Sequence, residues 1–268
     1  GLAVGTILIA TIIAAMTGSG GTAVVTMGLI AYPEMAKRGY DKSLSIGVIP
    51  AGGCLGPLIP PSILMIILGG LVNLSVGQLF AGGVFSGLLM SFLFIVYILI
   101  RCYLNPKLAP SLPKEELATW KEKFVSTRGL VLPLLIIVGV LGGIYSGAAT
   151  PTEAASIGAL GAIVSAAVHR TLTWDNLKQA MWMTLRVNAM VMWLLIGGTA
   201  FSYFLTGSGG GEYVVSLMVG VPLGIYGTVV LMMLIVLILG CFIDGAAITM
   251  ICAPIFFPII NKLGINPL

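Results

Sequence analysis

Long, continuous runs of apolar residues constrain this chain more than any other feature of its sequence. Only 8% of its 268 residues are charged, whereas a soluble domain carries about 25%. So little charge cannot cover a surface that faces water, and much of the surface must therefore face lipid. The runs lack the alternation of barrel strands, which predicts an all-α, multi-pass membrane protein in the lipid bilayer.

The chemistry-bearing residues exclude several classes of function. The net charge of +4 arises from basic residues between the apolar runs, where they act as topology signals rather than as a nucleic-acid surface. Four cysteines and the single histidine, His169, lack the spacing of a metal site. The sequence contains neither a G-x-S-x-G motif nor a P-loop. We therefore expect no enzyme and no organic cofactor.

The first apolar run is broken by a cluster of small residues. Residues 1–17 are apolar, Gly18-Ser19-Gly20-Gly21 interrupts them, and the run resumes over residues 22–35. A transmembrane helix needs about 20 apolar residues, so neither half spans comfortably. We predict a re-entrant hairpin, which enters and leaves the membrane by the same face, with its tip buried in protein or lining a cavity.

The second apolar run, residues 44–72, is broken near its middle. Gly52-Gly53, Gly56-Pro57 and Pro60-Pro61-Ser62 interrupt it. Each proline lacks an N–H group, and Pro61 disfavours the helical conformation for Pro60. This pattern predicts a span that is unwound in the middle, and an unbroken span follows over residues 79–102.

The remaining spans follow from charge and capping signals. Residues 105–128 form a basic, hydrophilic stretch that the positive-inside rule places in the cytoplasm. Spans are predicted at 130–147, 152–168 and 187–205, and Thr150-Pro151-Thr152-Glu153 is typical of a capping box that opens the second of these. The loop at 206–227 contains Glu212 and no Lys or Arg, as expected outside the cell.

A second broken run, 228–260, repeats the plan of the first. At one constant spacing along the chain, Ser19-Gly20 matches Asp244-Gly245, Pro33 matches Pro258, Lys37 matches Lys262 and Gly39 matches Gly264. By the span count, the first hairpin opens to the inside and the second to the outside. This is an inverted-topology repeat, a common plan of secondary transporters. The alternative is two unrelated spans that contain Gly for close packing.

The repeat defines the expected domains. Residues 1–104 form the first repeat, 105–128 the cytoplasmic loop and 129–268 the second repeat. Three spans precede the second hairpin and none precedes the first, while an unwound span follows only the first. The intact protein is therefore expected to extend at both ends by roughly two or three spans.

Asp244 is the strongest candidate for an ion site. It is the acidic residue in the middle of an otherwise apolar membrane segment, where a carboxylate costs at least ~2.5–3.5 kcal/mol on insertion scales and usually marks an ion or proton path. The competing interpretation is a carboxylate that caps the helix beginning at Gly245. Both roles can coexist in one residue.

The first hairpin tip and the broken span supply further candidates. Unwound carbonyls and hydroxyls suit an alkali cation, and helix N-termini beside them suit a carboxylate substrate. The competing interpretation is a kink with close packing. At the tip the candidates are Ser19, Gly20 and Thr22, and in the broken span they are Gly56, Pro60, Pro61 and Ser62.

These motifs, in this order, resemble the large membrane subunit of tripartite ATP-independent periplasmic (TRAP) transporters, the DctM-like family. The resemblance covers nearly the whole chain, although Thr17 and Gly21 stand where the family often has Ser and Pro. The segments that carry it are Gly18-Ser19-Gly20, Pro33 with Gly39-Tyr40-Asp41, residues 56–62, Gly147 with residues 150–155, and Gly240 with Asp244, Pro254 and Pro258.

The resemblance implies a bacterial inner-membrane symporter for organic acids such as C4-dicarboxylates, sialic acid or keto acids. It implies sodium coupling, an elevator motion, a periplasmic substrate-binding protein and a small membrane subunit. One sodium site is then framed by Ser19, Gly20, Gly56, Pro60 and Pro61, and half of a second by Asp244 and Gly245, with Thr22 and Ser62 toward the substrate. A related carrier that needs no binding protein, or a membrane scaffold subunit, remains an alternative.

Overall fold

The structure is a computed structural model, and it describes residues 1–110, 120–211, 213–214, 216 and 224–266. These residues form two compact units. The first contains residues 1–63 and 77–171, and the second contains residues 64–76 and 172–268. Glu212 and residues 111–119 of the predicted cytoplasmic loop lie outside the described residues.

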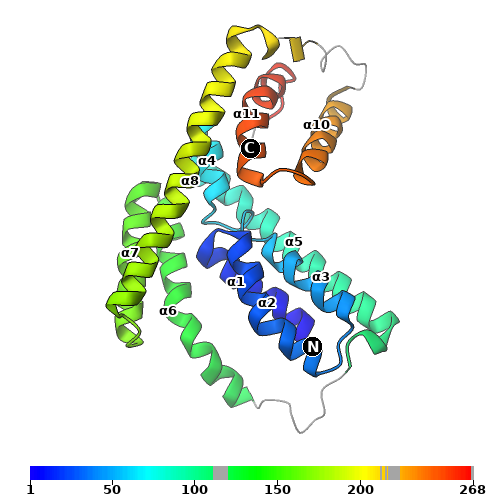
Figure 1. Ribbon diagram of the computed structural model, residues 1–268, viewed down its shortest axis with the longest axis vertical. Coiled ribbons are helices and arrows are strands. Elements are labelled where there is room, and N and C mark those ends of the chain that lie inside the picture. The colour runs from blue at the N-terminus through cyan, green and yellow to red at the C-terminus, as the bar shows by residue number, and fades with distance from the viewer. Residues whose placement is uncertain (111–119, 212, 215, 217–223, 267–268) are drawn as a thin grey trace. The chain divides into compact units, whose positions relative to one another are not determined.

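The first unit is built around a bundle in which α1, α2 and α3 pack against one another (Figure 1). Buried Ile7, Met35, Val48 and Ile98 belong to one core cluster from four helices. The Thr11 and Ser91 hydroxyls, 2.9 Å apart, add a polar link between α1 and α5. The helices of this unit are α1 (Leu2–Thr17), α2 (Gly20–Lys37), α3 (Lys42–Gly53), α5 (Val76–Leu104), the 3-10 turn η1 (Pro106–Leu108), α6 (Trp120–Tyr145) and α7 (Pro151–Val168).

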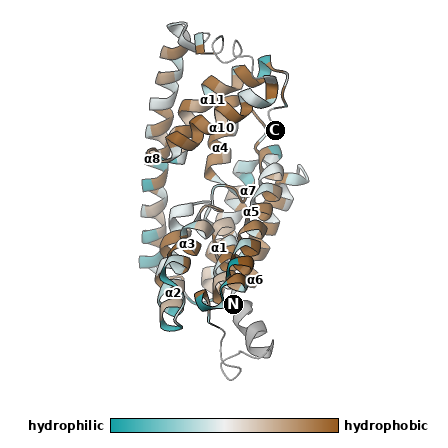
Figure 2. Cartoon of the chain, turned by 90° about the vertical axis from the view of Figure 1, so that its right-hand side faces the viewer, coloured by the Kyte–Doolittle hydropathy of each residue, from teal (hydrophilic) through white to brown (hydrophobic). Residues whose placement is uncertain are grey.

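The second unit joins the short helix that follows the proline-rich break to three helices from the C-terminal half. Gly198 brings α8 close to α11, because a methyl group at Gly198 would lie 2.9 Å from the Met250 Cβ. Figure 2 shows that hydrophobic residues cover most of α10 and α11. The helices are α4 (Ile63–Val72), α8 (Trp174–Gly207), α10 (Gly224–Gly240) and α11 (Gly245–Lys262).

The predicted breaks and caps are confirmed. The helix ends of α1 and α2 flank Gly18-Ser19, and α3 and α4 flank the proline-rich break. Thr150 accepts from the Glu153 N–H while the Glu153 carboxylate accepts from the Thr150 N–H at 2.8 Å, which is the expected capping box. Four helices within the described residues are long and apolar enough to cross a membrane: α5, α7, α8 and α11.

Two helices are longer than the sequence analysis predicted. α8 begins at Trp174, although the span was placed at 187–205, and α6 begins at Trp120 inside the predicted loop. Apolarity marks the part of a helix that is buried in lipid, whereas Lys and Arg are good helix formers that let the helix continue into the polar region. The boundaries 1–104, 105–128 and 129–268 describe repeats rather than compact units and stay a prediction.

The two broken runs have the same local structure at matching positions. α2 begins at Gly20 and ends at Lys37, and α11 begins at Gly245 and ends at Lys262, so both have 18 residues. Each is followed by a glycine in the left-handed region, with φ of 69° at Gly39 and 66° at Gly264. The backbone therefore follows the register in which the two sequences were matched.

The turns after the two helices also share their hydrogen bonds. The Tyr40 N–H donates to the Met35 carbonyl, and the Ile265 N–H donates to the Ile260 carbonyl, each at 3.1 Å. Both bonds belong to the turn that commonly closes a helix at a left-handed glycine. The shared start, end and closing turn favour the repeat over two unrelated spans, and the repeat stays a prediction.

We predict that Gly39→Ala and Gly264→Ala each lower the free energy of unfolding by about 1–2 kcal/mol, because an L-residue is strained at positive φ. Gly28→Ala is the matched control, since Gly28 is helical and has no atom within 4 Å of the position that a Cβ would take, and alanine has the higher helix propensity. Thermal unfolding of the purified protein measures all three. Equal behaviour of Gly264→Ala and Gly28→Ala would contradict the shared turn.

Candidate ion and substrate site

The tip between α1 and α2 is a tight turn made of small residues. Gly18 ends α1 in the left-handed conformation, with a φ of 59°, and its N–H donates to the Ala14 carbonyl at 2.8 Å. The Thr17 hydroxyl donates to the Ile13 carbonyl at 2.9 Å and lies 3.5 Å from the Ser19 amide nitrogen, which donates to it. The Thr17 side chain thus stabilises the turn by bonding backbone groups on both sides of it.

The N-terminus of α2 lacks a side-chain cap. Ser19 occupies the N-cap position in extended conformation, and its hydroxyl makes no capping hydrogen bond. The first N–H groups of a helix have no intrahelical partner and carry partial positive charge. Half-buried Ser19 and Gly20 therefore place the first turn of α2, which no side chain caps, beside one hydroxyl.

The break between α3 and α4 has more carbonyl groups than N–H groups to pair with them. Pro57, Pro60 and Pro61 each add a carbonyl and no N–H, and the Pro60–Pro61 bond is cis. The buried Ser62 hydroxyl donates to the Pro57 carbonyl at 2.6 Å and fastens the loop from inside. Such unwound carbonyls are the ligands that transporters offer to alkali cations.

The tip lies directly against this break, backbone against backbone. A methyl group on Gly56 would lie 2.7 Å from the Gly20 nitrogen and 2.7 Å from the Ser19 carbonyl carbon. A methyl group on Gly20 would lie 2.7 Å from the Gly53 carbonyl oxygen, and one on Gly18 would meet the Pro61 oxygen. Glycine is required at these positions because only hydrogen atoms fit between the two segments.

The structure therefore brings together most of the residues predicted for the first site. Ser19 and Gly20 lie at the tip, Gly56 faces them, and Pro60 and Pro61 lie in the same break. Thr22 is exposed in the first turn of α2, and Ser62 is buried behind the break. A role of Thr22 or Ser62 in substrate binding stays a prediction.

Asp244 lies at the start of α11, where the sequence placed it as a cap. Its carboxylate accepts a hydrogen bond from the Ala246 N–H at 3.0 Å, so the capping interpretation is confirmed. The residue is exposed, which leaves carboxylate oxygen available to a further ligand. A Cβ on the following Gly245 would lie 3.2 Å from the Leu64 Cδ1, so α4 packs against this end of α11.

Sequence reasoning missed two contributors to the first site. Thr17 was noted only as a departure from a family pattern, yet its hydroxyl organises the turn. Gly53 was counted as a helix interruption, yet its carbonyl meets Gly20 and its α-carbon lies against Val24. The only signal for Gly53 was the Gly52-Gly53 pair, which does not reveal its partner.

The fold and the site define a multi-pass membrane protein with paired broken helices. The family described as "Tripartite ATP-independent periplasmic transporter, DctM component" matches residues 1–268. The chain belongs to this family of bacterial inner-membrane transporter components, as the resemblance predicted.

Large permease proteins of other TRAP transporters align with all or nearly all of this chain. It is 35% identical over 269 residues to a C4-dicarboxylate TRAP transporter large permease protein of Pseudomonas aeruginosa and covers 62% of that protein. It is 31% identical over 269 residues to an ectoine/5-hydroxyectoine TRAP transporter large permease protein of Ruegeria pomeroyi, covering 61% of it. It is 29% identical to a sialic acid TRAP transporter large permease protein of Vibrio cholerae, over 94% of this chain and 58% of that protein. The chain thus spans about three fifths of these relatives.

We predict that Gly56→Ala separates the tip from the break, because the new methyl group would meet backbone atoms that cannot rotate away. Overpacking of this kind costs about 1–3 kcal/mol, so the midpoint of thermal unfolding should fall. Gly21→Ala is the control, since Gly21 is exposed at the same tip and has no neighbouring atom within 4 Å of the new methyl group. Unchanged midpoints for both variants would show that the close approach is absent.

Proposed function

We propose that this chain forms the ion- and substrate-coupling core of a TRAP large permease that carries an organic acid inward with sodium. One observation carries the proposal: the uncapped N-terminus of α2 lies against a break with surplus carbonyl groups. Carbonyl oxygens favour a cation, and free N–H groups favour an anion. A site that offers both is suited to a sodium ion beside a carboxylate.

Sodium is assigned to oxygen ligands of the two broken runs. In the first, the candidates are Ser19, Gly20, Gly56, Pro60 and Pro61, which lie at one contact. In the second, Asp244 and Gly245 take the matching position, since Ser19 and Asp244 are both N-caps of 18-residue helices. The carboxylate of Asp244 adds a charge that the first run lacks, so the two sites should differ in sodium affinity.

The substrate is proposed to be a small organic acid. The curated relatives are named for C4-dicarboxylate, ectoine and sialic acid, and these names support an acid without selecting one. Thr22, in the first turn of α2, and Ser62, in the break, are the proposed substrate contacts. By the same likeness, we propose a periplasmic substrate-binding protein and a small membrane subunit as partners.

We propose that both broken runs are re-entrant hairpins of opposite orientation and that they move together as an elevator. The length of α1 supports the first hairpin: its 16 residues extend about 24 Å, which is short of a hydrocarbon core of about 30 Å. α11 is long enough to cross a membrane by itself, so the second hairpin rests on its match to the first. The shared helix start, helix end and closing turn support a common origin of the two hairpins. In an elevator, such paired elements carry the site across as one block.

We predict that Asp244→Asn abolishes sodium-driven uptake while leaving α11 capped, because asparagine is as good an N-cap as aspartate but carries no charge. The assay uses the full-length protein with its small subunit and binding protein in proteoliposomes, and follows a radiolabelled organic acid with and without an inward sodium gradient. Asp175→Asn is the control, since Asp175 is an aspartate at the start of α8, outside the two broken runs.

Other outcomes would change the proposal in defined ways. Uptake driven equally well by a proton gradient alone would keep the transporter and remove sodium. Full sodium-driven uptake by Asp244→Asn would remove the charge of Asp244 from the mechanism. Folded protein that takes up no acid under either gradient would favour a scaffold subunit.

A further inference from the structure

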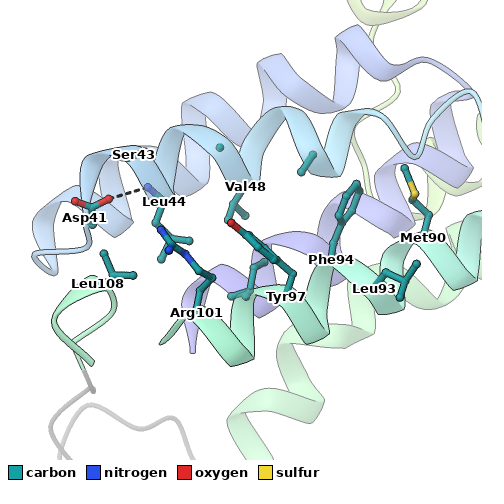
Figure 3. A pocket seen from close by; sticks show the side chains of 13 residues that line it. Asp41, Ser43, Leu44, Val48, Met90, Leu93, Phe94, Tyr97, Arg101 and Leu108 are labelled. Carbon is teal, nitrogen blue, oxygen red and sulfur yellow. Dashed lines mark hydrogen bonds between the residues drawn. The ribbon is translucent and has the colours of Figure 1, made fainter. Parts of the chain in front are cut away.

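A groove runs between α3 and α5 in the first unit, away from the tip and the break. Its volume is about 630 Å³. Figure 3 shows the side chains of the two helices facing each other across it, with Asp41 and Arg101 toward one end and Met90 and Leu93 toward the other. It is therefore amphipathic along its length, with a charged end and an apolar end.

The apolar part of the groove is formed by one face of α5. Met90, Leu93, Phe94, Tyr97 and Ile98 line it and recur at helical spacing. Leu93 and Tyr97 keep more than half of their surface exposed, at 52% and 59%. The walls are thus apolar and accessible, and no described side chain fills the space between them.

The length of the groove matches one leaflet of a bilayer. From Met90 to Arg101, the lining residues extend about 16 Å along the axis of α5. Half of a hydrocarbon core of about 30 Å is nearly the same distance. With α5 spanning the membrane, Arg101 stands at the level of the lipid headgroups and Met90 stands near the midplane.

The charged end favours an anion. Arg101 is exposed and has no ion-pair partner in the part of the chain that the structure describes. Lys42 and Lys107 adjoin the lining residues in sequence. Asp41 is the one carboxylate among the lining residues; it accepts from the Leu44 N–H at 2.9 Å, and the Asp41 N–H donates to the Leu108 carbonyl at 2.9 Å. Among the lining residues, the free charge of Arg101 therefore stands beside one carboxylate that already accepts a backbone hydrogen bond.

From this geometry we propose that the groove binds one anionic phospholipid of the cytoplasmic leaflet. The phosphate lies at Arg101 and beside the Ser43 hydroxyl, and one acyl chain lies along Leu93, Phe94 and Met90. Basic pockets between membrane helices on the cytoplasmic side are suited to anionic headgroups. A helix from another protein would fill the apolar part, but it would leave the charge of Arg101 unmatched. The proposal rests on α5 spanning the membrane with its Arg101 end at the cytoplasmic side, as the basic stretch 105–128 predicts, and it does not depend on sodium coupling.

Native mass spectrometry of the full-length complex tests the proposal, with added phosphatidylglycerol as the probe and phosphatidylcholine, a zwitterion without net charge, as the comparison. Gly47→Phe places a ring in the groove, since Gly47 lines it and has no atom within 4 Å of a new Cβ. Gly82→Phe is its control, because Gly82 is equally open on α5 but does not line the groove. We expect Gly47→Phe to lose one bound phosphatidylglycerol and Gly82→Phe to keep it.

Removal of the charge is the second test. Arg101→Gln should weaken phosphatidylglycerol binding about fivefold, the effect of one basic residue near a membrane surface, and should weaken phosphatidylcholine binding less, because the choline ammonium cancels the net charge of that headgroup. Arg186→Gln is the control, on an exposed arginine of α8. Unchanged phosphatidylglycerol binding by folded Gly47→Phe, or by Arg101→Gln, would overturn the proposal. Release of the small subunit by Gly47→Phe, with lipid binding intact, would assign the groove to a protein helix instead.

Discussion

The backbone contact between the α1–α2 tip and the α3–α4 break is the constraint on which the rest of the candidate site depends. Two non-helical segments can approach so closely only when neither carries a side chain at the contact, as at Gly20 and Gly56. Close approach places the N-terminus of α2 beside the carbonyls of the break. Both non-helical segments thus lie against protein, as non-helical backbone at membrane depth requires.

The two broken runs differ at the helix N-terminus that follows each break. Ser19 leaves the N-terminus of α2 uncapped, whereas Asp244 caps α11 through the Ala246 N–H. The helix that follows the first break, α4, belongs to the same compact unit as α11 and contacts Gly245 through Leu64. α4 therefore follows the proline-rich break directly in the chain and packs against the start of α11.

Much of the fold could be predicted from the sequence because neighbouring residues determine where its helices begin and end. Gly18 ends a helix, Thr150 and Glu153 begin one, and three prolines unwind one, all through rules that involve neighbouring residues. The matching of Ser19 with Asp244 was also visible, because a repeat preserves spacing. Helix ends were less predictable where charged residues continue a helix beyond the lipid, as at Trp174.

The long-range contacts could not be predicted. The residues alone do not show that Gly56 meets Gly20 rather than another small residue, since Gly occurs 36 times in the chain; only the family resemblance placed the two in one site. The groove between α3 and α5 was missed for the same reason: Gly47 and Arg101 are ordinary residues of their own helices. They line one groove only because packing brings two distant helices together, and that packing cannot be inferred from a single sequence.

Membrane-sided labelling distinguishes two hairpins of opposite orientation from two spans of any other arrangement. Lys37 and Lys262 occupy matching, exposed positions at the ends of α2 and α11. Lys37→Cys and Lys262→Cys, each in a full-length background without the native cysteines, would be exposed to a membrane-impermeant maleimide in intact cells and in inverted vesicles. The inverted repeat predicts labelling of position 262 from the periplasm and of position 37 from the cytoplasm. Labelling of both positions from the same side would contradict it.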